Sequence, residues 1–384
     1  MKNTFKKLCA AALVLLICFS FAGCYNENDS WAVKKENNSN IPIGGYIYFQ
    51  YSAYIDARAK VGTDTEVMKA TIDDESAETW INNKIAESVK MFYFIEDKFN
   101  DLDLSFTDEE IESMKTSTDS TWGYYGNVFE AMGISKDSFH LVATEFSSKY
   151  GKVFHSMYGK DGEKAVSDEE LKKHYEENYL SYEYFTDSKT TLDENGDTVD
   201  LTEKEIADRE NDMKSFIPAI NSGDKTMSEA AIEYQVKYVL ENSTYTTSST
   251  LISSVTGDEI LTAINDAKEN EVIFIDTVTA KKIALGRKLP ISDKSAEILS
   301  SDTDRATLLS SFKSDDFTDY VEEQAKEVIG YEFNNSAINK AKLSSIIDDS
   351  DRNGTSSIVS EDNSSSEESS DEDIPEDDSE AEDE

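Results

Sequence analysis

The most regular pattern in the sequence is an apolar stripe that runs from Ser135 to Tyr158. Its members recur at steps of three and four residues, the spacing of one face of an α-helix: Phe139, Val142, Phe146, Tyr150, Val153 and Met157. A second stripe of this kind, between Asp74 and Asn100, consists of Ile81, Ile85, Val89, Phe92 and Phe99. Both patterns predict long helices that bury one face, so much of the core must be helical.

Local signals mark where several helices begin. In a capping box, a Ser or Thr hydroxyl precedes a Glu by three residues. The sequence has three: Thr107 with Glu110, Ser167 with Glu170, and Thr202 with Glu205. After Pro290 a further apolar face predicts that the chain returns to helix: Phe317, Val321, Gln324 and Val328.

The region between Tyr179 and Pro290 has a different pattern. Short runs rich in β-forming residues predict strands at 180–185, 235–240, 271–276 and 281–286, with helical stretches at 202–220 and 257–268 between them. Asn195-Gly196 is a strong turn signal. This region therefore predicts a small α+β unit within a mainly helical chain.

The predicted fold class is α+β, with a mainly helical domain into which a small α+β domain is inserted. The predicted segments are a signal at 1–23, a tether at 24–40, a helical domain at 41–178, an α+β domain at 179–290, returning helices at 291–347 and a tail at 348–384. The returning helices are expected to complete the core of the helical domain. A chain of this length suits two domains better than one.

The first 23 residues have the layout of a secretory signal. Lysines precede an apolar run of about 15 residues, which is shorter than the roughly 20 residues that a membrane-spanning helix needs. The next residues resemble a bacterial lipobox, in which the cysteine is lipidated and becomes the first residue of the mature protein: Phe21, Ala22, Gly23 and Cys24. The alternative is an ordinary exported protein that discards Cys24. The two other cysteines lie within the signal, so no internal disulfide is expected.

The chain is strongly acidic, with a formal net charge of −42. This charge argues against nucleic-acid binding, which requires a basic surface, and against direct adsorption to anionic lipid headgroups. From Asp351 to Glu384 the sequence holds 15 Asp or Glu against the single Arg352. We expect this tail to be disordered, because it cannot bury enough apolar surface to offset its conformational entropy. It either solvates the chain or docks cations and basic partners.

The sequence predicts no cofactor and no metal site. The three histidines, His140, His155 and His174, are separated by 15 and 19 residues, whereas a metal pair on a helix needs a step of four. The acidic stretch at 193–204 lacks the glycine at position six and the glutamate at position twelve of a calcium loop, so a hairpin turn is expected there. The sequence also contains no phosphate-binding loop, dinucleotide fingerprint or serine elbow.

Three stretches of the sequence resemble the PrsA/SurA-type extracytoplasmic foldases, especially their lipoprotein branch. Residues 44–61 resemble the opening helix of the chaperone domain, residues 130–159 a helix pair introduced by Gly-Ile-Ser, and residues 165–179 the helix leading into the parvulin domain. The resemblance implies a SurA-like chaperone domain held by the lipid on Cys24 at the outer face of a bacterial cytoplasmic membrane. The implied partners are unfolded or newly exported polypeptides.

By the same resemblance, the α+β region corresponds to a parvulin-type peptidyl-prolyl isomerase domain. Residues 219–235 resemble the helix–Gly–helix step of that domain. Active members place one histidine on the first strand and another on the last, but the matching stretches 182–185 and 279–288 contain none. The resemblance therefore implies a degenerate domain with weak or no isomerase activity. The alternative is an active isomerase with a noncanonical pocket, built from Tyr184 and Phe185.

Client binding is predicted for aromatic residues within 44–61. Aromatic rings offer large contact area without demanding a fixed partner, and the candidates are Tyr46, Phe49, Tyr51 and Tyr54. The competing interpretation is that these rings occupy the core and scattered surface positions. Two further functions stay open: a solute-binding lipoprotein, although the pattern lacks repeated βαβ units, and a purely structural envelope protein.

Overall fold

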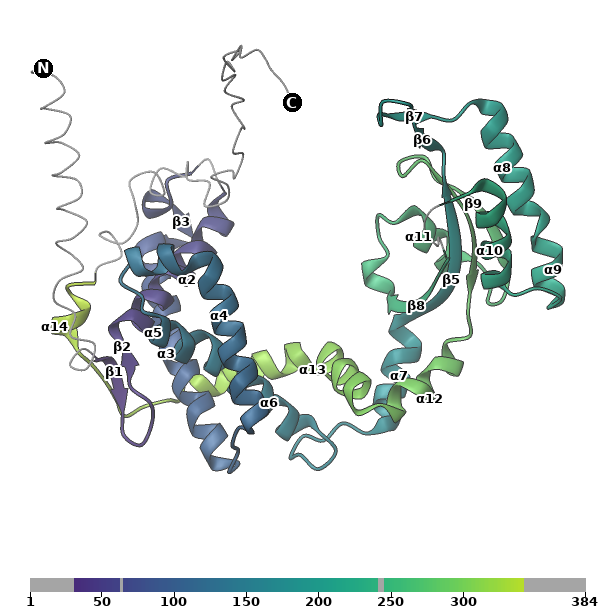
Figure 1. The fold of residues 1–384 in the computed structure, drawn as a ribbon. Coiled ribbons are helices and arrows are strands. Elements are labelled where there is room, and N and C mark those ends of the chain that lie inside the picture. The colour runs from purple at the N-terminus through teal and green to yellow at the C-terminus, as the bar shows by residue number, and fades with distance from the viewer. Residues whose placement is uncertain (1–30, 63–64, 241–244, 342–384) are drawn as a thin grey trace, which may run out of the picture. The chain divides into compact units, whose positions relative to one another are not determined.

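The computed structural model describes residues 31–62, 65–240 and 245–341 (Figure 1). The predicted signal, the lipobox with Cys24, and the acidic tail at 348–384 lie outside these ranges. No described helix is both long enough and apolar enough to cross a membrane. The described residues form two compact units, one of residues 31–92, 109–145 and 329–341, the other of residues 93–108 and 146–328. Together they make a mainly helical α+β protein, as the sequence predicts.

The first unit combines helices with a three-stranded antiparallel sheet of order β11-β1-β2. Its elements are β1 (Trp31–Lys35), β2 (Ile41–Pro42), α2 (Ile43–Val61), η2 (Val67–Lys69), β3 (Thr71–Ile72), β4 (Glu75–Ser76), the first part of α3 (Ala77–Asp101), α4 (Asp108–Ala131), α5 (Lys136–Phe139), η3 (His140–Glu145), β11 (Tyr331–Phe333) and α14 (Asn335–Ile338). The stripe predicted on α3 is buried at all five positions: Ile81, Ile85, Val89, Phe92 and Phe99.

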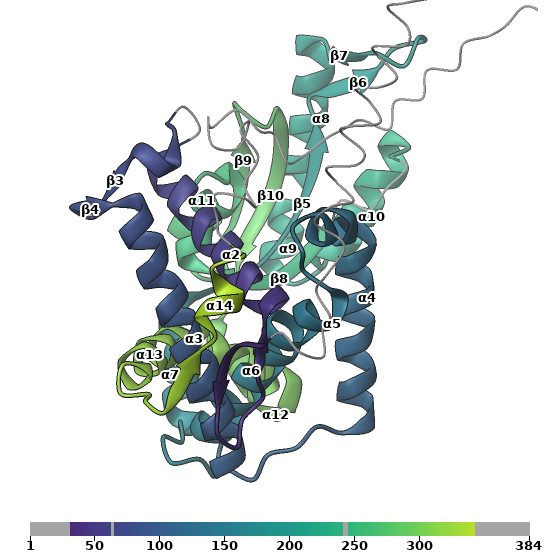
Figure 2. The same cartoon turned by 90° about the vertical axis from the view of Figure 1, so that its left-hand side faces the viewer.

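Part of the predicted tether is folded. Residues 31–35 form β1, in which Ala32 and Val33 are fully buried. β1 pairs with β11, where Val33 lies opposite Phe333, and α14 packs beside β1 and α2 (Figure 2). The tether prediction is wrong for these residues, because the partner strand lies some 300 residues later in the chain. Pairing between such remote segments leaves no local periodicity in the sequence.

Two glycines allow the start of α2 to lie close to α5 and η3. A Cβ atom on Gly44 would lie 2.7 Å from Ser138 Oγ and 3.2 Å from the backbone nitrogen of Ser135. A Cβ atom on Gly45 would lie 2.6 Å from Val142 Cγ1. Since any side chain here would overlap its neighbours, glycine sets the separation between these helices.

The long stripe predicted at 135–158 spans three consecutive helical segments: α5, the π-helical η3, and α6 (Phe146–Tyr158), which belongs to the second unit. Within the stripe, Phe139, Val142, Val153 and Met157 are buried, as predicted. The sequence predicted one uniform helix and missed the π-helical turn. Apolar spacing does not distinguish such a wider turn from a regular one.

The second unit contains a four-stranded antiparallel sheet of order β8-β5-β10-β9. Its remaining elements are α7 (Asp168–Asn178), β5 (Tyr179–Ser188), β6 (Thr190–Leu192), β7 (Thr198–Asp200), α8 (Glu203–Ser215), α9 (Ile217–Ser222), α10 (Met227–Tyr238), β8 (Tyr245–Leu251), η4 (Ile252–Ser254), α11 (Glu259–Asp266), β9 (Val272–Asp276), β10 (Lys282–Lys288), α12 (Ile291–Ser300) and α13 (Asp302–Ala325). Of the segment predicted to return at 291–347, α12 and α13 pack against α7 in this unit, whereas β11 and α14 belong to the first.

Helices cover both faces of the four-stranded sheet (Figure 1). The core under α8, α9 and α10 includes Phe185, Met213, Ile220, Met227, Tyr234, Ile283 and Leu285. The core on the α11 side includes Leu180, Tyr182, Ile260, Ile264, Ile275 and Ala284. Successive residues of a strand point to opposite faces, so neighbours on β5 enter different cores.

Local signals located most of the helices of this unit. Two of the three predicted capping boxes are present, at the starts of α7 and α8, and α10 begins with a box that was not predicted, Thr226 with Glu229. The predicted turn at Asn195-Gly196 joins β6 to β7. The strand predicted at 235–240 is wrong, because α10 continues to Tyr238. Its buried Ala231 and Tyr234 pack on the sheet, and this burial outweighs the β-propensity of the nearby valines.

Candidate functional site

An exposed aromatic surface lies on the first unit. On α4, Tyr124 is 82% exposed, Tyr125 is 50% exposed and Val128 is 42% exposed. The two tyrosines adjoin a cluster of half-buried and buried rings: Tyr48, Tyr51, Trp122, Phe129 and Phe139. Val128 precedes one of these rings, Phe129, in the chain. We call these eight residues the aromatic patch. It places apolar area in solvent at positions that a simple helix bundle would make polar.

Ring contacts join the aromatic patch into one network. Phe129 and Phe139 stack with centroids 5.2 Å apart, and Tyr48 meets both rings edge-on at 6.0 and 5.5 Å. Tyr125 lies 6.2 Å from Phe129 and 6.4 Å from Tyr124. Aromatic pairs in such geometries are worth about 0.5–1.5 kcal/mol beyond their buried area. The exposed tyrosines therefore stand on a packed aromatic base.

Only one of the four residues predicted to bind clients belongs to the aromatic patch. Tyr51 contacts Phe129 edge-on at 6.5 Å. Tyr46 is half-buried, and burial raises the pKa of its phenol. Phe49 and Tyr54 are only 7% and 1% exposed, so they are core residues, and assigning them to client binding is wrong.

The α4 members of the patch were missed by the sequence reasoning. Within the segment TWGYYGNVF at 121–129, Trp122, Tyr125 and Phe129 recur at steps of three and four residues, the spacing of one helical face, and Tyr124 lies next to Tyr125. The segment also concentrates four aromatic side chains and two glycines in nine residues of a helix that is otherwise polar. The concentration of aromatic residues in an otherwise polar helix could have identified these positions from the sequence.

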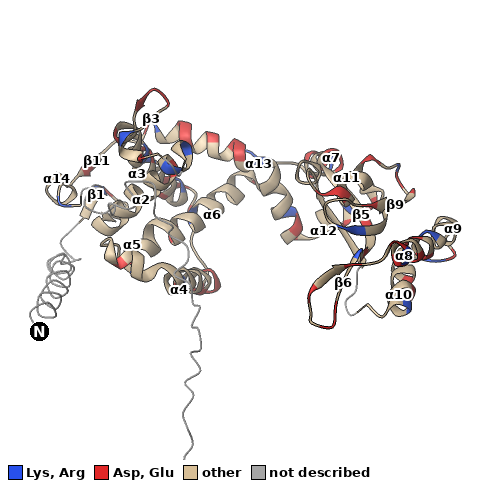
Figure 3. Ribbon diagram, turned by 90° about the horizontal axis from the view of Figure 1, so that it is seen from above, with Lys and Arg blue, Asp and Glu red and all other residues tan. Residues whose placement is uncertain are grey.

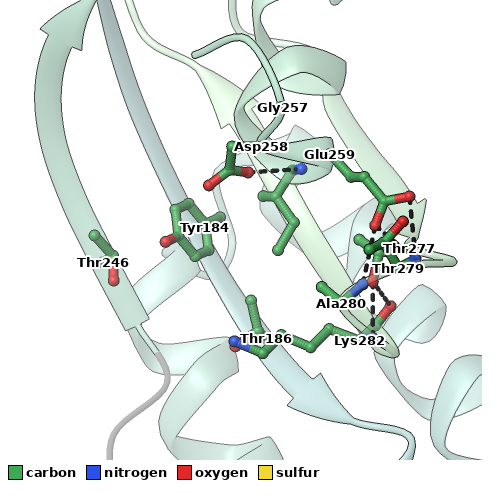
Figure 4. A pocket seen from close by; sticks show the side chains of 11 residues that line it. Tyr184, Thr186, Thr246, Gly257, Asp258, Glu259, Thr277, Thr279, Ala280 and Lys282 are labelled. Carbon is green, nitrogen blue, oxygen red and sulfur yellow. Dashed lines mark hydrogen bonds between the residues drawn. The ribbon is translucent and has the colours of Figure 1, made fainter. Parts of the chain in front are cut away.

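The second unit has a pocket of about 460 Å³ on the α11 side of its sheet (Figure 4). Most of its lining residues are small or carry hydroxyl groups. The full lining consists of Tyr184 and Thr186 of β5, Thr246 of β8, residues 257–260 at the start of α11, and Thr277, Thr279, Ala280 and Lys282 at the β9–β10 turn. The ring of Tyr184 stacks on Tyr182 with centroids 5.8 Å apart. The ring of Tyr184 and the hydroxyl groups of the threonines thus line the same pocket.

Both carboxylates of the pocket are already engaged by the backbone. Glu259 accepts hydrogen bonds of 3.0–3.3 Å from the N–H groups of residues 278–280. These bonds, the one from Ala280 above all, hold the pKa of Glu259 below its usual range. Asp258 caps α11 by accepting from the N–H groups of residues 260 and 261, both at 2.9 Å. Backbone N–H groups therefore hold both carboxylates in place, and the lowered pKa of Glu259 makes it a weaker base than an ordinary glutamate.

The two residues predicted for a noncanonical isomerase pocket lie on opposite faces of β5. Tyr184 lines the pocket, whereas Phe185 is fully buried in the core under α8, α9 and α10. The assignment of Phe185 to the pocket is therefore wrong. Adjacent residues of a strand cannot line one site on one face, since their side chains alternate.

Buried carboxylates fix the face of β5 that carries Phe185. Asp187 accepts two hydrogen bonds from Arg209, at 2.9 and 2.8 Å, and one from Tyr234 at 2.7 Å. A second network of this kind consists of Glu183, Arg287 and Tyr245. Burial, together with the hydrogen bond to Glu183, raises the pKa of Tyr245 to about 12. These networks tie β5 to β8, β10, α8 and α10, so this face of the sheet is scaffold.

The three histidines lie on different helical segments, η3, α6 and α7. His140 hydrogen-bonds Thr118 through Nδ1 at 2.8 Å, and His174 stacks on Phe312 with centroids 4.3 Å apart. Within the described ranges, no group of His, Cys, Asp and Glu is arranged to hold a metal ion. The residues that line the pocket include neither histidine nor cysteine. The pocket can bind through its ring and hydroxyls, but it holds no imidazole pair.

No protein-family model and no curated protein matches the chain. Among solved structures, the chain is similar to foldase protein PrsA from Lactococcus lactis, with 13% identity and a TM-score of 0.36 over 83% of this chain and 100% of that one. It is also similar to PrsA from Streptococcus pneumoniae (12% identity, TM-score 0.36, 71% of this chain and 97% of that one). PrsA from Bacillus subtilis matches with 12% identity and a TM-score of 0.26, over 74% of this chain and 92% of that one. Likenesses this distant do not establish a family.

Proposed function

We propose that this chain is an extracytoplasmic chaperone of the foldase type, held at the outer face of a bacterial cytoplasmic membrane by a lipid on Cys24. The observation that carries the proposal is the aromatic patch. A contiguous exposed apolar surface commonly marks an interaction site. Tyrosine and tryptophan rings contact varied apolar segments at low cost in side-chain entropy. The clients that suit such a surface are unfolded or newly exported polypeptides.

The charge of the chain supports this class of partner. The formal net charge is −42, and over the described residues Lys and Arg are scattered among Asp and Glu (Figure 3). Such a charge keeps a chaperone soluble and favours neutral or basic clients over nucleic acid. A lipid anchor would raise the local concentration of the chaperone where chains leave the membrane, without requiring any new contact.

Prolyl isomerisation is the second candidate function, and the position of Tyr184 in the pocket favours it. A volume of about 460 Å³ admits a prolyl residue and its neighbours. The barrier to peptide rotation is about 18–20 kcal/mol, and this pocket would have to lower it without a histidine pair, with hydroxyl groups, Lys282 and two backbone-bound carboxylates on its wall. We therefore propose weak or no isomerase activity. Acceleration of a proline-limited refolding reaction that Tyr184→Ser abolishes would instead establish the isomerase.

The sheet topology disfavours a solute-binding lipoprotein. That class of protein is built from βαβ units with parallel strands around a cleft. The named strands of the described residues pair antiparallel in every sheet. We therefore place the chaperone first.

Suppression of client aggregation tests the chaperone proposal. The triple variant Tyr124→Ser, Tyr125→Ser and Val128→Ser removes the exposed part of the patch and leaves its buried base in place. We expect this variant to lose most of its ability to keep a reduced, unfolded model protein from aggregating. The melting temperature should fall only modestly, because the variant loses two ring contacts, Tyr124–Tyr125 and Tyr125–Phe129, worth about 0.5–1.5 kcal/mol each.

A matched control comes from the second unit. Ile232, Val236 and Val239 on and after α10 are 58%, 74% and 83% exposed, so changing all three to Ser removes similar apolar area elsewhere. This control variant should suppress aggregation as the unchanged chain does. Full suppression by the patch variant, or an equal loss in the control, would contradict a client site at the aromatic patch.

A further inference from the structure

We propose that the outer edge of β8 binds an extended segment of an unfolded polypeptide as an additional strand of the sheet. This inference rests on the proposed chaperone function and names a second contact, on the second unit, with the same class of partner. It concerns the backbone of the client rather than its apolar side chains. Three features of β8 support it: the composition of the strand, its place at the edge of the sheet and its position beside the pocket.

β8 is an edge strand that lacks the usual protection of such edges. In the order β8-β5-β10-β9 it pairs with β5 alone among the described strands. Its seven residues, YTTSSTL, include no charge and no proline, and none of them is buried. Natural edge strands are commonly blunted by charges, prolines, bulges or short length. An uncharged, seven-residue edge instead leaves a row of backbone groups ready to pair.

The opposite edge of the same sheet shows the contrast. β9 has five residues, two of its residues are buried, and it ends at Asp276. The carboxylate of Asp276 forms an ion pair with Lys189. Short length and a charged end are devices that block strand addition. The sheet therefore has one protected edge and one that accepts an extended chain.

The pocket lies beside the open edge. Thr246 of β8 lines it, and Thr246 is paired in register with Tyr184 of β5 (Figure 4). A strand added to β8 would place every second side chain on the same face as these two residues. In strand addition, backbone hydrogen bonds supply affinity, and adjacent pockets select alternate side chains. The pocket would thus contact alternate side chains of a client whose backbone is hydrogen-bonded to β8.

Charge favours a client over a second copy of the protein as the occupant. Two copies that paired through β8 would each bring a net charge of −42, and like net charges oppose association. The edge itself is neutral, so it does not repel a neutral or basic segment. Unfolded chains also expose extended backbone throughout their length, which a folded partner does not. The occupant is therefore an extended, uncharged or basic segment of a non-native polypeptide.

Backbone pairing is tested with a peptide and its N-methylated form. The probe is an acetylated, amidated peptide of alternating Thr and Val with a Lys at each end, added to the full chain in lipid nanodiscs. Hydrogen exchange should slow at every second amide of residues 246–250, because alternate N–H groups of an edge strand point outward. Methylation of alternate peptide amides should weaken binding about tenfold or more, since it removes backbone hydrogen bonds. Equal binding of both peptides, or unchanged exchange in β8, would overturn the proposal.

Two variants provide an independent arm. Of the adjacent residues Thr247 and Ser248, one directs its N–H toward β5 and the other outward. Thr247→Pro and Ser248→Pro are made separately, and the variant that retains the melting temperature identifies the outward N–H. That variant should lose peptide binding yet still suppress aggregation through the aromatic patch. If it binds the peptide normally, the edge is not the site.

The remaining outcomes separate this inference from the chaperone proposal. Protection of β8 that appears without peptide and grows with protein concentration means self-pairing, and it overturns the inference. If neither proline variant folds, the comparison of methylated and unmethylated peptides still decides. If the patch variant keeps full aggregation suppression while β8 binds the peptide, the proposal of a client site at the aromatic patch is wrong and the proposal of strand addition at β8 is supported.

Discussion

The aromatic patch of the first unit and the pocket of the second unit differ in the chemistry that each offers a polypeptide. The patch exposes rings such as Tyr124 on a base of packed aromatic residues. The pocket presents hydroxyl groups and one ring, Tyr184, with its carboxylates already bound to backbone N–H groups. Apolar contact is nondirectional and tolerates many sequences, whereas hydrogen bonds require geometry. Under the two proposals, the first unit binds apolar side chains of a client and the second unit binds its extended backbone.

The scaffolds beneath the two surfaces differ as well. In the first unit, the close approach at Gly44 sets the distance between α2 and α5. In the second unit, buried carboxylates such as Asp187 tie the sheet to its helices. A helix contact that depends on glycine is destabilised when an added side chain overlaps its neighbours. A buried ion-pair network is destabilised when one partner is removed. Substitutions in each scaffold should therefore separate the contributions of the two units.

The largest effect is expected when the Asp187 network loses its cation. Arg209→Ala leaves the Asp187 side chain, which is 3% exposed, without its bidentate partner. Removing one partner of a buried ion pair costs about 3–5 kcal/mol. Chemical denaturation should show this loss, with hydrogen exchange assigning it to the second unit. The matched control is Lys172→Ala, whose exposed pairing with Glu176 at 3.8 Å is worth at most ~1 kcal/mol.

That result would also test how independent the two surfaces are. If Arg209→Ala unfolds the sheet while aggregation suppression persists, the aromatic patch works without the second unit. An equal cost for Arg209→Ala and Lys172→Ala would show that the Asp187 network contributes nothing to the scaffold.

An intermediate effect is expected at the helix approach of the first unit. Gly44→Ala places a Cβ atom 2.9 Å from Ser138 Cβ and 3.2 Å from the backbone of Ser135, so the helices must move apart. Overpacking of this kind costs about 1–3 kcal/mol. Gly123→Ala on α4 is the matched control, because a Cβ atom there meets no other atom within 4 Å.

The two alanine variants should shift the melting temperature in opposite directions. In a helix, Ala is favoured over Gly by up to about 1 kcal/mol, so Gly123→Ala should stabilise the first unit. Client binding should weaken for Gly44→Ala, since displacement of α2 moves Tyr48 and Tyr51 away from Phe129. A rise in the melting temperature for both variants would show that the approach of α2 to α5 tolerates a side chain.

The smallest effect is expected at the wall of the pocket. Ionised Glu259 holds the turn at residues 278–280, and its pKa is lowered in the folded chain. A lowered folded pKa means that this stabilisation is present above the ordinary pKa of glutamate and is lost as the pH falls through the lowered value. Amide signals of residues 278–280 should therefore broaden or shift in acid. Glu259→Gln should remove this pH dependence and leave the aromatic patch unaffected.

Much of the fold was predictable from local patterns. The stripe on α3 is buried at every predicted position, and the helix starts at α7 and α8 have their predicted capping boxes. On α13, Phe317 and Val321 are buried as predicted, but Gln324 is exposed and Ala325 takes its place. These signals work because a helix records its buried face in the spacing of its own residues. The domain boundaries and the lipid on Cys24 stay predictions.

The candidate sites were less predictable, because they depend on which segments meet. β1 was assigned to a tether since its partner β11 lies near the other end of the described chain. Phe49 and Tyr54 are chemically suited to client contact, yet packing buries them. β8 has no apolar alternation in its sequence, and its strand conformation follows from pairing with β5.

The sequence by itself determined the helical character of the chain, its acidic charge and the lack of histidine in the α+β region. These properties belong to individual residues or to spacings within one segment, so no knowledge of the folded chain is needed to obtain them. Only the tertiary structure decided that α4 exposes Tyr124 and Tyr125, that Tyr184 rather than Phe185 faces the pocket, and that β8 is left at an edge. Exposure and pairing are relations between distant segments, and they are fixed only when those segments pack together.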